Sequence, residues 1–192
     1  VMNCNPFTKG HLALITYAAS RCSLLHIFVV EEDRSLFPFE VRMRLVKEGT
    51  AHLPNVKVHP SGPYMISSAT FPTYFLKKGE DAARIQSELD ITLFASRIAP
   101  LFHITKRFAG EEPLDPVTRD YNEAMIRLLP QYSISFIKIA RTTAETPEGN
   151  PEVISASRVR KLLAETGVTE EVLQLVPPCT AQYLKNEFGA RP

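Results

Sequence analysis

Long apolar runs, a cysteine framework and an excess of charge of one sign are all missing from this sequence. No segment approaches the roughly 18–20 apolar residues of a membrane-spanning helix, and no signal-peptide pattern is present. We therefore expect a protein that neither spans a membrane nor is secreted. Three cysteines among 192 residues, an odd and small number, favour a reducing, cytoplasmic location over a disulfide scaffold.

Charge and metal-ligand spacing exclude two further classes of partner. The formal net charge is +1, which gives no global field for nucleic acid, so any anion must bind at a local site. The cysteines and histidines lack the spacing of a zinc site. We expect no metal ion held by the protein's own side chains.

What the chain does contain is a regular alternation of strand and helix patterns. A short strand at Val1 is followed by expected strands over residues 24–30, 55–59, 104–108 and 133–140. Helices are expected from about residue 10 and over residues 39–51, 80–97, 116–129, 155–165, 170–175 and 179–188. This alternation predicts a doubly wound, Rossmann-like α/β fold with a parallel five-stranded sheet, flanking helices and a helical C-terminal tail.

We interpret residues 1–192 as a single domain, with an α/β core over 1–153 and C-terminal helices over 154–192. In the helix over 80–97, the apolar residues Ala82, Ile85, Leu89 and Leu93 share one stripe. The Thr-, Pro- and Gly-rich stretch from Arg141 to Val153 is expected to be a mobile loop. Ligands of such folds bind at the carboxyl ends of the strands, which is where this loop would lie.

The first turn, Asn3–His11, is the most informative stretch. It joins a short strand to a helix, is rich in small and polar residues, and puts Gly10 and His11 at the start of the helix. Free N–H groups and the helix dipole at such a position favour a bound anion. The residues alone therefore predict a phosphate site.

Two motifs extend this prediction. Thr8-Lys9-Gly10-His11 resembles the T/H-x-G-H motif of the nucleotidylyltransferase superfamily, and Ile154–Arg160 resembles its I-S-x-S-x-x-R motif. Either motif alone is a weak signal, but in this order, one after the first strand and one opening a late helix, they are strong.

The resemblance covers nearly the whole chain and indicates one family within the superfamily. The chain is similar to the C-terminal domain of the citrate (pro-3S)-lyase ligase family. The further stretches that carry the likeness are Asn3–Thr8, Phe28–Asp33, Phe37–Glu40, Ala69–Pro72 and Phe108–Pro113. In that family an acetyltransferase-like domain precedes this one, so we expect such a domain upstream of Val1.

The resemblance implies an ATP-dependent acetate:thiol ligase. Its substrates would be ATP, with Mg²⁺, and acetate. Acetyl-adenylate and pyrophosphate would form first, and the acetyl group would then pass to the prosthetic-group thiol of the citrate lyase acyl carrier subunit.

The resemblance also implies site residues. His11, Thr8 and Arg160 would be catalytic. His11 would donate to the α-phosphate, and Arg160 would neutralise the phosphates. Residues expected to bind the nucleotide are Asn3, Cys4, Asn5, Gly10, Arg107, Gly110, Glu112, Ser155 and Ser157.

Some of these residues have plainer interpretations. His11 could be a surface histidine near a helix start, Arg107 a member of a surface salt bridge and Glu112 a turn residue. Cys4 invites interpretation as a nucleophile, but no covalent step on the protein is needed, so a small buried residue is simpler. Arg34 and Arg42 could meet pyrophosphate, although a solvated helix face is the simpler interpretation of Arg42.

Two other functions remain open at this point. The motifs are shared by adenylyltransferases that make a dinucleotide-type cofactor from ATP and a phosphorylated precursor. A nucleotide-binding module without catalysis would carry the same turn.

Overall fold

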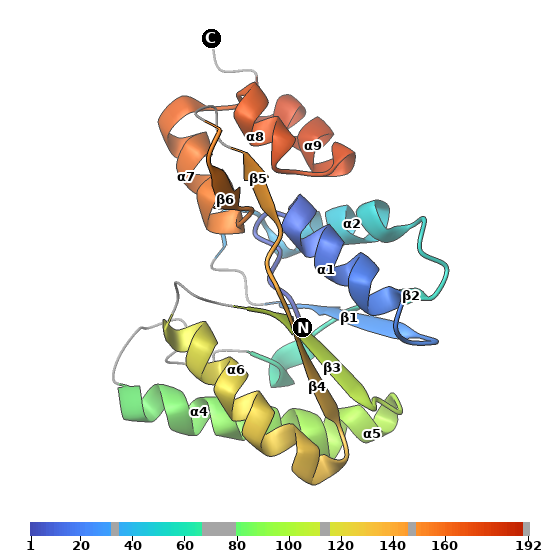
Figure 1. The fold of residues 1–192 in the computed structure, drawn as a ribbon. Helices are drawn as coiled ribbons and strands as arrows, with labels where there is room; N and C mark the ends of the chain where they lie inside the picture. The colour runs from blue at the N-terminus through green and yellow to red at the C-terminus, as the bar shows by residue number, and fades with distance from the viewer. Residues whose placement is uncertain (32–34, 67–79, 112–115, 146–148, 190–192) are drawn as a thin grey trace. The chain divides into compact units, whose positions relative to one another are not determined.

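The computed structural model of the chain describes residues 1–31, 35–66, 80–111, 116–145 and 149–189 (Figure 1). The backbone divides into two compact units. The first comprises Val1–Val29, Asp33–Pro60 and Arg141–Pro192, and the second comprises Val30–Glu32 and Ser61–Ala140.

The described helices and strands run in the following order: α1 (Lys9–Ala19), β1 (Leu25–Val29), α2 (Phe39–Thr50), β2 (Val56–Pro60), η1 (Gly62–Tyr64), α4 (Glu80–Leu93), η2 (Phe94–Ile98), α5 (Ala99–Leu101), β3 (Lys106–Gly110), α6 (Pro116–Leu128), η3 (Leu129–Tyr132), β4 (Ser135–Ile139), β5 (Thr143–Glu145), β6 (Pro151–Val153), α7 (Ala156–Thr166), α8 (Glu170–Gln174) and α9 (Pro178–Phe188).

The first unit is built on the parallel pair β1–β2. Leu25 pairs with Val56 and Val29 with Pro60. Met2 forms a parallel bridge to Val29, so the start of the chain runs along the outer side of β1. Helices α1 and α2 pack here around a core that includes Phe7, Ile15, Ile27, Val29 and Val46.

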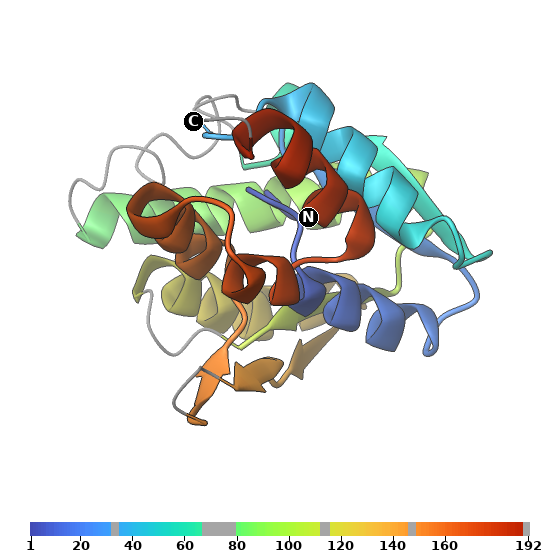
Figure 2. The ribbon, with the colours of Figure 1, turned by 90° about the horizontal axis from the view of Figure 1, so that it is seen from above.

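The three C-terminal helices complete the first unit with a second apolar cluster. Phe37, which is fully buried just before α2, packs with Val159 of α7, Val172 of α8 and Leu184 of α9. Figure 2 shows α9 running beside α2, with which it is in contact. The residues after 154 are therefore part of the same core as the residues before 60.

The second unit contains the parallel pair β3–β4, with Lys106 opposite Ser135 and Gly110 opposite Ile139. Helices α4 and α6 pack against each other in this unit (Figure 1). The helix of α4 continues through one π-helical turn, Phe94–Ile98, into α5.

The mixed α/β class predicted from the sequence is confirmed, but the predicted sheet is not found. In the part of the chain that the structure describes, the strands form two separate parallel pairs and one antiparallel pair, not a five-stranded sheet. The first expected strand is reduced to the single bridge at Met2.

The stretch expected to be a loop contains a short hairpin. Thr143 pairs with Val153 and Glu145 with Pro151, so β5 and β6 are antiparallel. The loop prediction was wrong here because two three-residue strands are too short to leave a periodic apolar pattern.

Within the apolar stripe predicted for the helix over 80–97, Leu93 is half-buried, but the two middle residues face solvent. Ile85 is 62% exposed and Leu89 is 54% exposed, whereas Ser87 and Asp90 are buried. Asp90 tolerates burial because its two oxygens accept hydrogen bonds, from the Tyr121 hydroxyl at 2.6 Å and the Ile66 N–H at 2.8 Å. A polar group with fixed partners therefore lies on the buried side of α4.

Candidate functional site

The candidate site is centred on the turn that leads into α1. Thr8 is the N-cap of α1 and is almost fully buried. Its hydroxyl accepts a hydrogen bond from the His11 N–H, and the His11 ring accepts one from the Thr8 N–H, which makes a reciprocal capping box. Within the first motif, Thr8 therefore holds the His11 imidazole in place.

This contact also decides which ring nitrogen of His11 carries the proton. Nδ1 lies 3.1 Å from the Thr8 backbone nitrogen and 2.9 Å from the Thr8 hydroxyl oxygen. A backbone N–H can only donate, so Nδ1 must accept and the proton of the neutral ring is on Nε2. His11 thus keeps one N–H donor directed away from its own helix cap.

Burial keeps this imidazole neutral. Burial and, to a smaller extent, the positive charge of Arg141 together lower the pKa of His11 to about 4. At neutral pH, His11 therefore offers a hydrogen bond to an anion and not a full positive charge.

The start of α1 is less open to an anion than the sequence predicted. The Lys9 N–H donates to the Leu175 carbonyl at 3.0 Å, and the His11 N–H is held by Thr8. Two of the N–H groups expected to face a phosphate are thus satisfied by the protein. The expectation of a phosphate cradle made by free N–H groups of α1 is wrong for these two groups.

The second motif opens α7 as predicted. Ser155 is the N-cap, and its hydroxyl accepts from the Arg158 N–H at 3.1 Å. Val159 is buried inside the unit. The Arg158 guanidinium donates to Glu152 and Glu171, which ties α7 to β6 and α8.

Arg160 joins the two motifs. Its guanidinium donates to the backbone carbonyl of Asn5 in the first turn and to the Ser157 hydroxyl at 3.1 Å. Three of the predicted site residues, Asn5, Ser157 and Arg160, therefore meet. Arg160 already has protein partners and does not simply project toward a ligand.

Gly10 is needed where the two motifs approach each other. A Cβ at this position would lie 2.7 Å from the Ile154 carbonyl oxygen, closer than side-chain carbon atoms come to backbone oxygen. The sequence assigned Gly10 to close approach of a nucleotide. The structure gives it close approach of the second motif's own backbone.

The turn is also supported by the C-terminal helix. The Thr180 hydroxyl of α9 donates to the Phe7 carbonyl at 2.9 Å, and both residues are fully buried. The Phe7 ring lies against Gly49 of α2, where a Cβ would clash with it. Contacts from α2, α7 and α9 thus converge on the turn over residues 3–8.

Arg42 is the residue that the sequence analysis misjudged. It is completely buried, not on a solvated helix face. Its Nη1 lies 2.9 Å from both the backbone oxygen and the side-chain Oδ1 of Asn3, and its Nε donates to the Phe37 carbonyl at 2.9 Å. The partner lies 39 residues away in sequence, so no local pattern could have identified this contact.

Cys4 is a core residue and not a nucleophile. It is 1% exposed, and burial raises the pKa of its thiol to about 12. The thiolate, which is the reactive form, is therefore absent at neutral pH. Its backbone has a positive φ of 53°, and the following Asn5–Pro6 peptide bond is cis.

Two other predicted site residues belong to the second unit. Arg107 is 8% exposed, and its guanidinium lies over the Phe94 ring and donates to the Tyr121 hydroxyl at 3.0 Å. It is thus not the surface salt bridge that we considered. Gly110 ends β3, where a Cβ would meet nothing within 4 Å. Arg34 and Glu112 lie outside the described residues.

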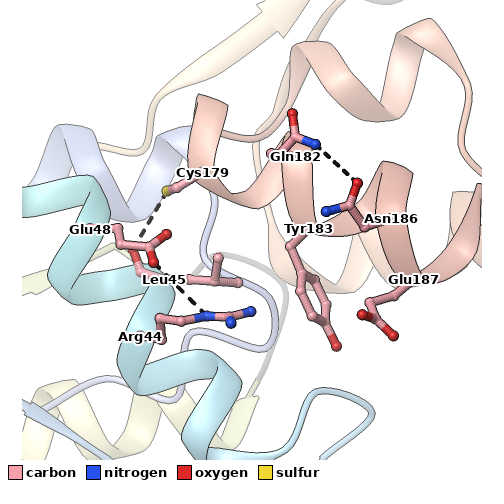
Figure 3. Close-up of a pocket in the computed structure, with 8 residues that line it drawn as sticks. All are labelled: Arg44, Leu45, Glu48, Cys179, Gln182, Tyr183, Asn186 and Glu187. Carbon is pink, nitrogen blue, oxygen red and sulfur yellow. Dashed lines mark hydrogen bonds and ion pairs between the residues drawn. The ribbon is translucent and has the colours of Figure 1, made fainter.

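The first unit also has a surface hollow of about 340 Å³ between α2 and α9. In Figure 3, Arg44 and Glu48 of α2 face Tyr183 and Glu187 of α9 across it, and the Cys179 thiol points toward α2. None of the residues predicted from the motifs lines this hollow. It is therefore separate from the turn.

Neither a metal centre nor a membrane helix is found in the described ranges. These residues hold no group of three or more His, Cys, Asp or Glu side chains placed to bind a metal ion. None of the described helices combines the length and apolar character needed to cross a bilayer.

Comparison with known proteins identifies the family. Residues 1–184 match the family described as Citrate lyase ligase C-terminal domain. The chain therefore belongs to the citrate lyase ligase C-terminal domain family, as the sequence analysis predicted.

Individual relatives agree with this family. The chain is 44% identical over 186 residues to a citrate (pro-3S)-lyase ligase of Escherichia coli (strain K12), covering 97% of this chain and 53% of that protein. It is 44% identical over 188 residues to the protein of the same name in Klebsiella pneumoniae, covering 96% and 53%. The chain thus spans about half the length of these relatives.

A more distant relative has a different name. The chain is 28% identical over 166 residues to a phosphopantetheine adenylyltransferase of Proteus mirabilis, covering 82% of this chain and 91% of that protein.

Proposed function

We propose that this chain is the adenylating domain of an ATP-dependent ligase that activates acetate and acetylates a thiol of the citrate lyase acyl carrier subunit. The observation that carries the proposal is the 40–44% identity to proteins named citrate (pro-3S)-lyase ligase, over 96–97% of the chain. The meeting of the two motifs through Arg160 and Asn5 supports it.

The proposed chemistry has two steps. In the first, an oxygen of acetate attacks the α-phosphorus of ATP, the bond from that phosphorus to the bridging oxygen breaks, and pyrophosphate leaves. In the second, the carrier thiol loses its proton and attacks the acetyl carbonyl, and AMP leaves with the former acetate oxygen. No bond to the protein forms in either step, which agrees with the buried, protonated Cys4.

In this proposal, His11 is the central donor. The Nε2–H of a neutral imidazole would donate to an α-phosphate oxygen, where negative charge develops during attack. Thr8 acts by holding the ring in that tautomer. Asn3 would add a second donor near the reacting phosphate.

The second motif would hold the leaving group. In the described part of the chain, the N–H groups of Ala156 and Ser157 have no protein partner at the start of α7, so they can receive a phosphate oxygen. Ser155, Ser157 and Arg160 would bind the β- and γ-phosphates. We further propose that Asn5, Gly10, Arg107, Gly110 and Glu112 contribute to the nucleotide site, as the family resemblance implies.

ATP would enter as its magnesium complex. Mg²⁺ retains several waters and binds chiefly to substrate phosphates. We also propose that acetate and the acyl carrier subunit are substrates of this reaction. We further propose that the protein is located in the cytoplasm.

A second candidate is an adenylyltransferase that joins ATP to a phosphorylated precursor such as phosphopantetheine. The observation that favours it is the 28% identity to a phosphopantetheine adenylyltransferase, of which the chain covers 91%. In that reaction a phosphate oxygen and not a carboxylate attacks the same α-phosphorus.

Exchange of labelled pyrophosphate into ATP separates these functions. With purified chain, ATP and Mg²⁺, we expect exchange that depends on acetate. Exchange that appears only with phosphopantetheine would reject the acetate assignment and support the second candidate. ATP binding without exchange under either condition would indicate a nucleotide-binding module without catalysis.

A further inference from the structure

We infer that Arg42 is a positioning residue of this site, which holds the Asn3 amide so that its NH₂ group, and not its oxygen, faces the reacting phosphate. The buried Arg42–Asn3 contact is the observation behind this inference. The inference rests on the proposed adenylation, since it assigns a new role within that site.

The hydrogen bonds determine the orientation of the amide. An arginine guanidinium only donates, so the side-chain atom of Asn3 that lies 2.9 Å from Nη1 of Arg42 must be the amide oxygen. The Ser35 hydroxyl donates to the same oxygen at 3.5 Å. The oxygen is thus engaged from the protein side, and among the described residues no acceptor takes up the Nδ2 hydrogens.

The arginine itself is held firmly. Its Nε donates to the Phe37 carbonyl, and the same Nη1 also donates to the Asn3 backbone carbonyl at 2.9 Å. A guanidinium with several donors in one plane can make these contacts together, which a lysine ammonium cannot reproduce. The fixed plane therefore orients both the backbone and the side chain of Asn3.

Asn3 lies where the orientation of its amide can affect a bound ligand. Asn3 directly follows Met2, whose bridge to Val29 is at the carboxyl end of β1, the edge of a parallel sheet where ligands bind. The side chain is only partly buried. An amide with its oxygen tied inward can offer only N–H donors to a bound group, which suits an anion and repels no phosphate oxygen.

The decisive variant is Asn3→Asp. An aspartate keeps an oxygen for Arg42 and replaces the NH₂ donor by a negatively charged oxygen. We expect an unfolding midpoint at or above that of the parent chain, but a loss of the acetate-dependent exchange rate of about 10²-fold or more. A role confined to folding would leave the rate unchanged, because the Arg42 contact persists.

Asn186→Asp is the matched control. Asn186 lies on α9 in the same unit and hydrogen-bonds Gln182 on the surface. We expect the parent exchange rate from this variant, which excludes a general effect of one added negative charge.

Arg42→Lys tests the positioning directly. We expect the rate of exchange at saturating ATP to fall about 10–100-fold, which is typical when a residue that orients a ligand-contacting side chain is replaced. The KM for ATP should change little. Arg44→Lys, on the exposed side of α2, is the control and should behave as the parent. Combining Arg42→Lys with Asn3→Ala should be no worse than the poorer single variant.

The failure of this inference is separable from the failure of the proposed function. A parent chain without exchange rejects the function. An active parent together with a fully active Asn3→Asp variant rejects only the inference, as do additive effects of Arg42→Lys and Asn3→Ala. If Arg42→Lys does not fold, the Asn3→Asp result decides alone.

Discussion

At the residue scale, His11 combines burial with a fixed tautomer. Thr8 occupies Nδ1 and leaves Nε2–H as the single ring donor. A donor of this kind stabilises developing charge without itself being a cation. Its contribution should consequently appear in the rate of reaction more than in the affinity for ATP.

The first prediction concerns this donor. His11→Ala should lower the acetate-dependent exchange rate by roughly 10²–10³-fold and leave ATP affinity mostly intact, as measured by exchange kinetics and calorimetry. His52→Ala, which removes an exposed histidine, should behave as the parent. ATP binding that survives His11→Ala in a chain that never shows exchange would favour the non-catalytic module.

The low pKa of His11 makes a second prediction, about stability. The folded chain takes up a proton only near pH 4, whereas an unfolded chain takes it up near pH 6.5. Between these values the unfolded state binds more protons, so the free energy of unfolding should fall as the pH drops from about 6.5 to 4. Above pH 6.5 both states are neutral and this contribution is constant.

His11→Asn isolates the effect, because the asparagine oxygen can accept the Thr8 N–H without titrating. Urea unfolding at several pH values should show a shallower decline for this variant than for the parent. His26 and His59, whose pKa values are also lowered by burial, are present in both proteins and cancel in the comparison. Equal slopes would contradict the prediction.

At the scale of elements, the important contact is the one between the start of α1 and the residue before α7. The third prediction tests it. Gly10→Ala should destabilise the chain by about 1–3 kcal/mol, since its Cβ would lie 2.7 Å from the Ile154 oxygen. Gly110→Ala, with open space around the new Cβ, should change the unfolding free energy by less than about 0.5 kcal/mol.

Chemical denaturation of both glycine variants measures this difference. Equal stability of Gly10→Ala and the parent would mean that the two helix starts can separate without cost. Activity is not the readout here, because both positions are proposed to be near the nucleotide.

The sequence predicted those elements whose signals are local. The helix expected over residues 155–165 is α7, with Ser155 as its N-cap, because a cap depends on its own next three residues. The helix expected over residues 39–51 is α2, which the structure starts at Phe39. Both are decided within one or two turns of chain.

The sequence did not predict what depends on distant partners. Arg42 looked like a charge on a polar helix face, and only Asn3, from the start of the chain, makes its burial favourable. The role of Gly10 similarly depends on Ile154. In α4, Asp90 is buried because Tyr121 and Ile66 bind it, and no local pattern identifies these partners.

At the scale of the whole molecule, the first unit is assembled from three separate stretches of chain. The fourth prediction follows from this. A chain truncated after Val153 lacks α7, α8 and α9, which bury Phe37 and supply the partner of the Phe7 carbonyl. We expect it to lose cooperative unfolding of the first unit.

Circular dichroism and urea titration would measure this loss, and dye binding would report exposed apolar surface. A chain ending at Gly189 is the control and should unfold as the parent does. If the truncated chain keeps the parent's cooperative transition, the C-terminal helices are not required for cooperative folding of the first unit.

The support of the first turn by the last helices has a consequence for how the protein is made. Asn5 and Phe7 emerge from the ribosome more than 150 residues before their partners Arg160 and Thr180. The contacts that complete the turn can therefore form only after Thr180 has emerged, and contacts of such long sequence separation form slowly. The β3–β4 pair of the second unit, by contrast, joins two strands that lie within residues 106–139. The proposed nucleotide site would thus be completed later than this pair, and a product terminated before Arg160 would lack part of that site.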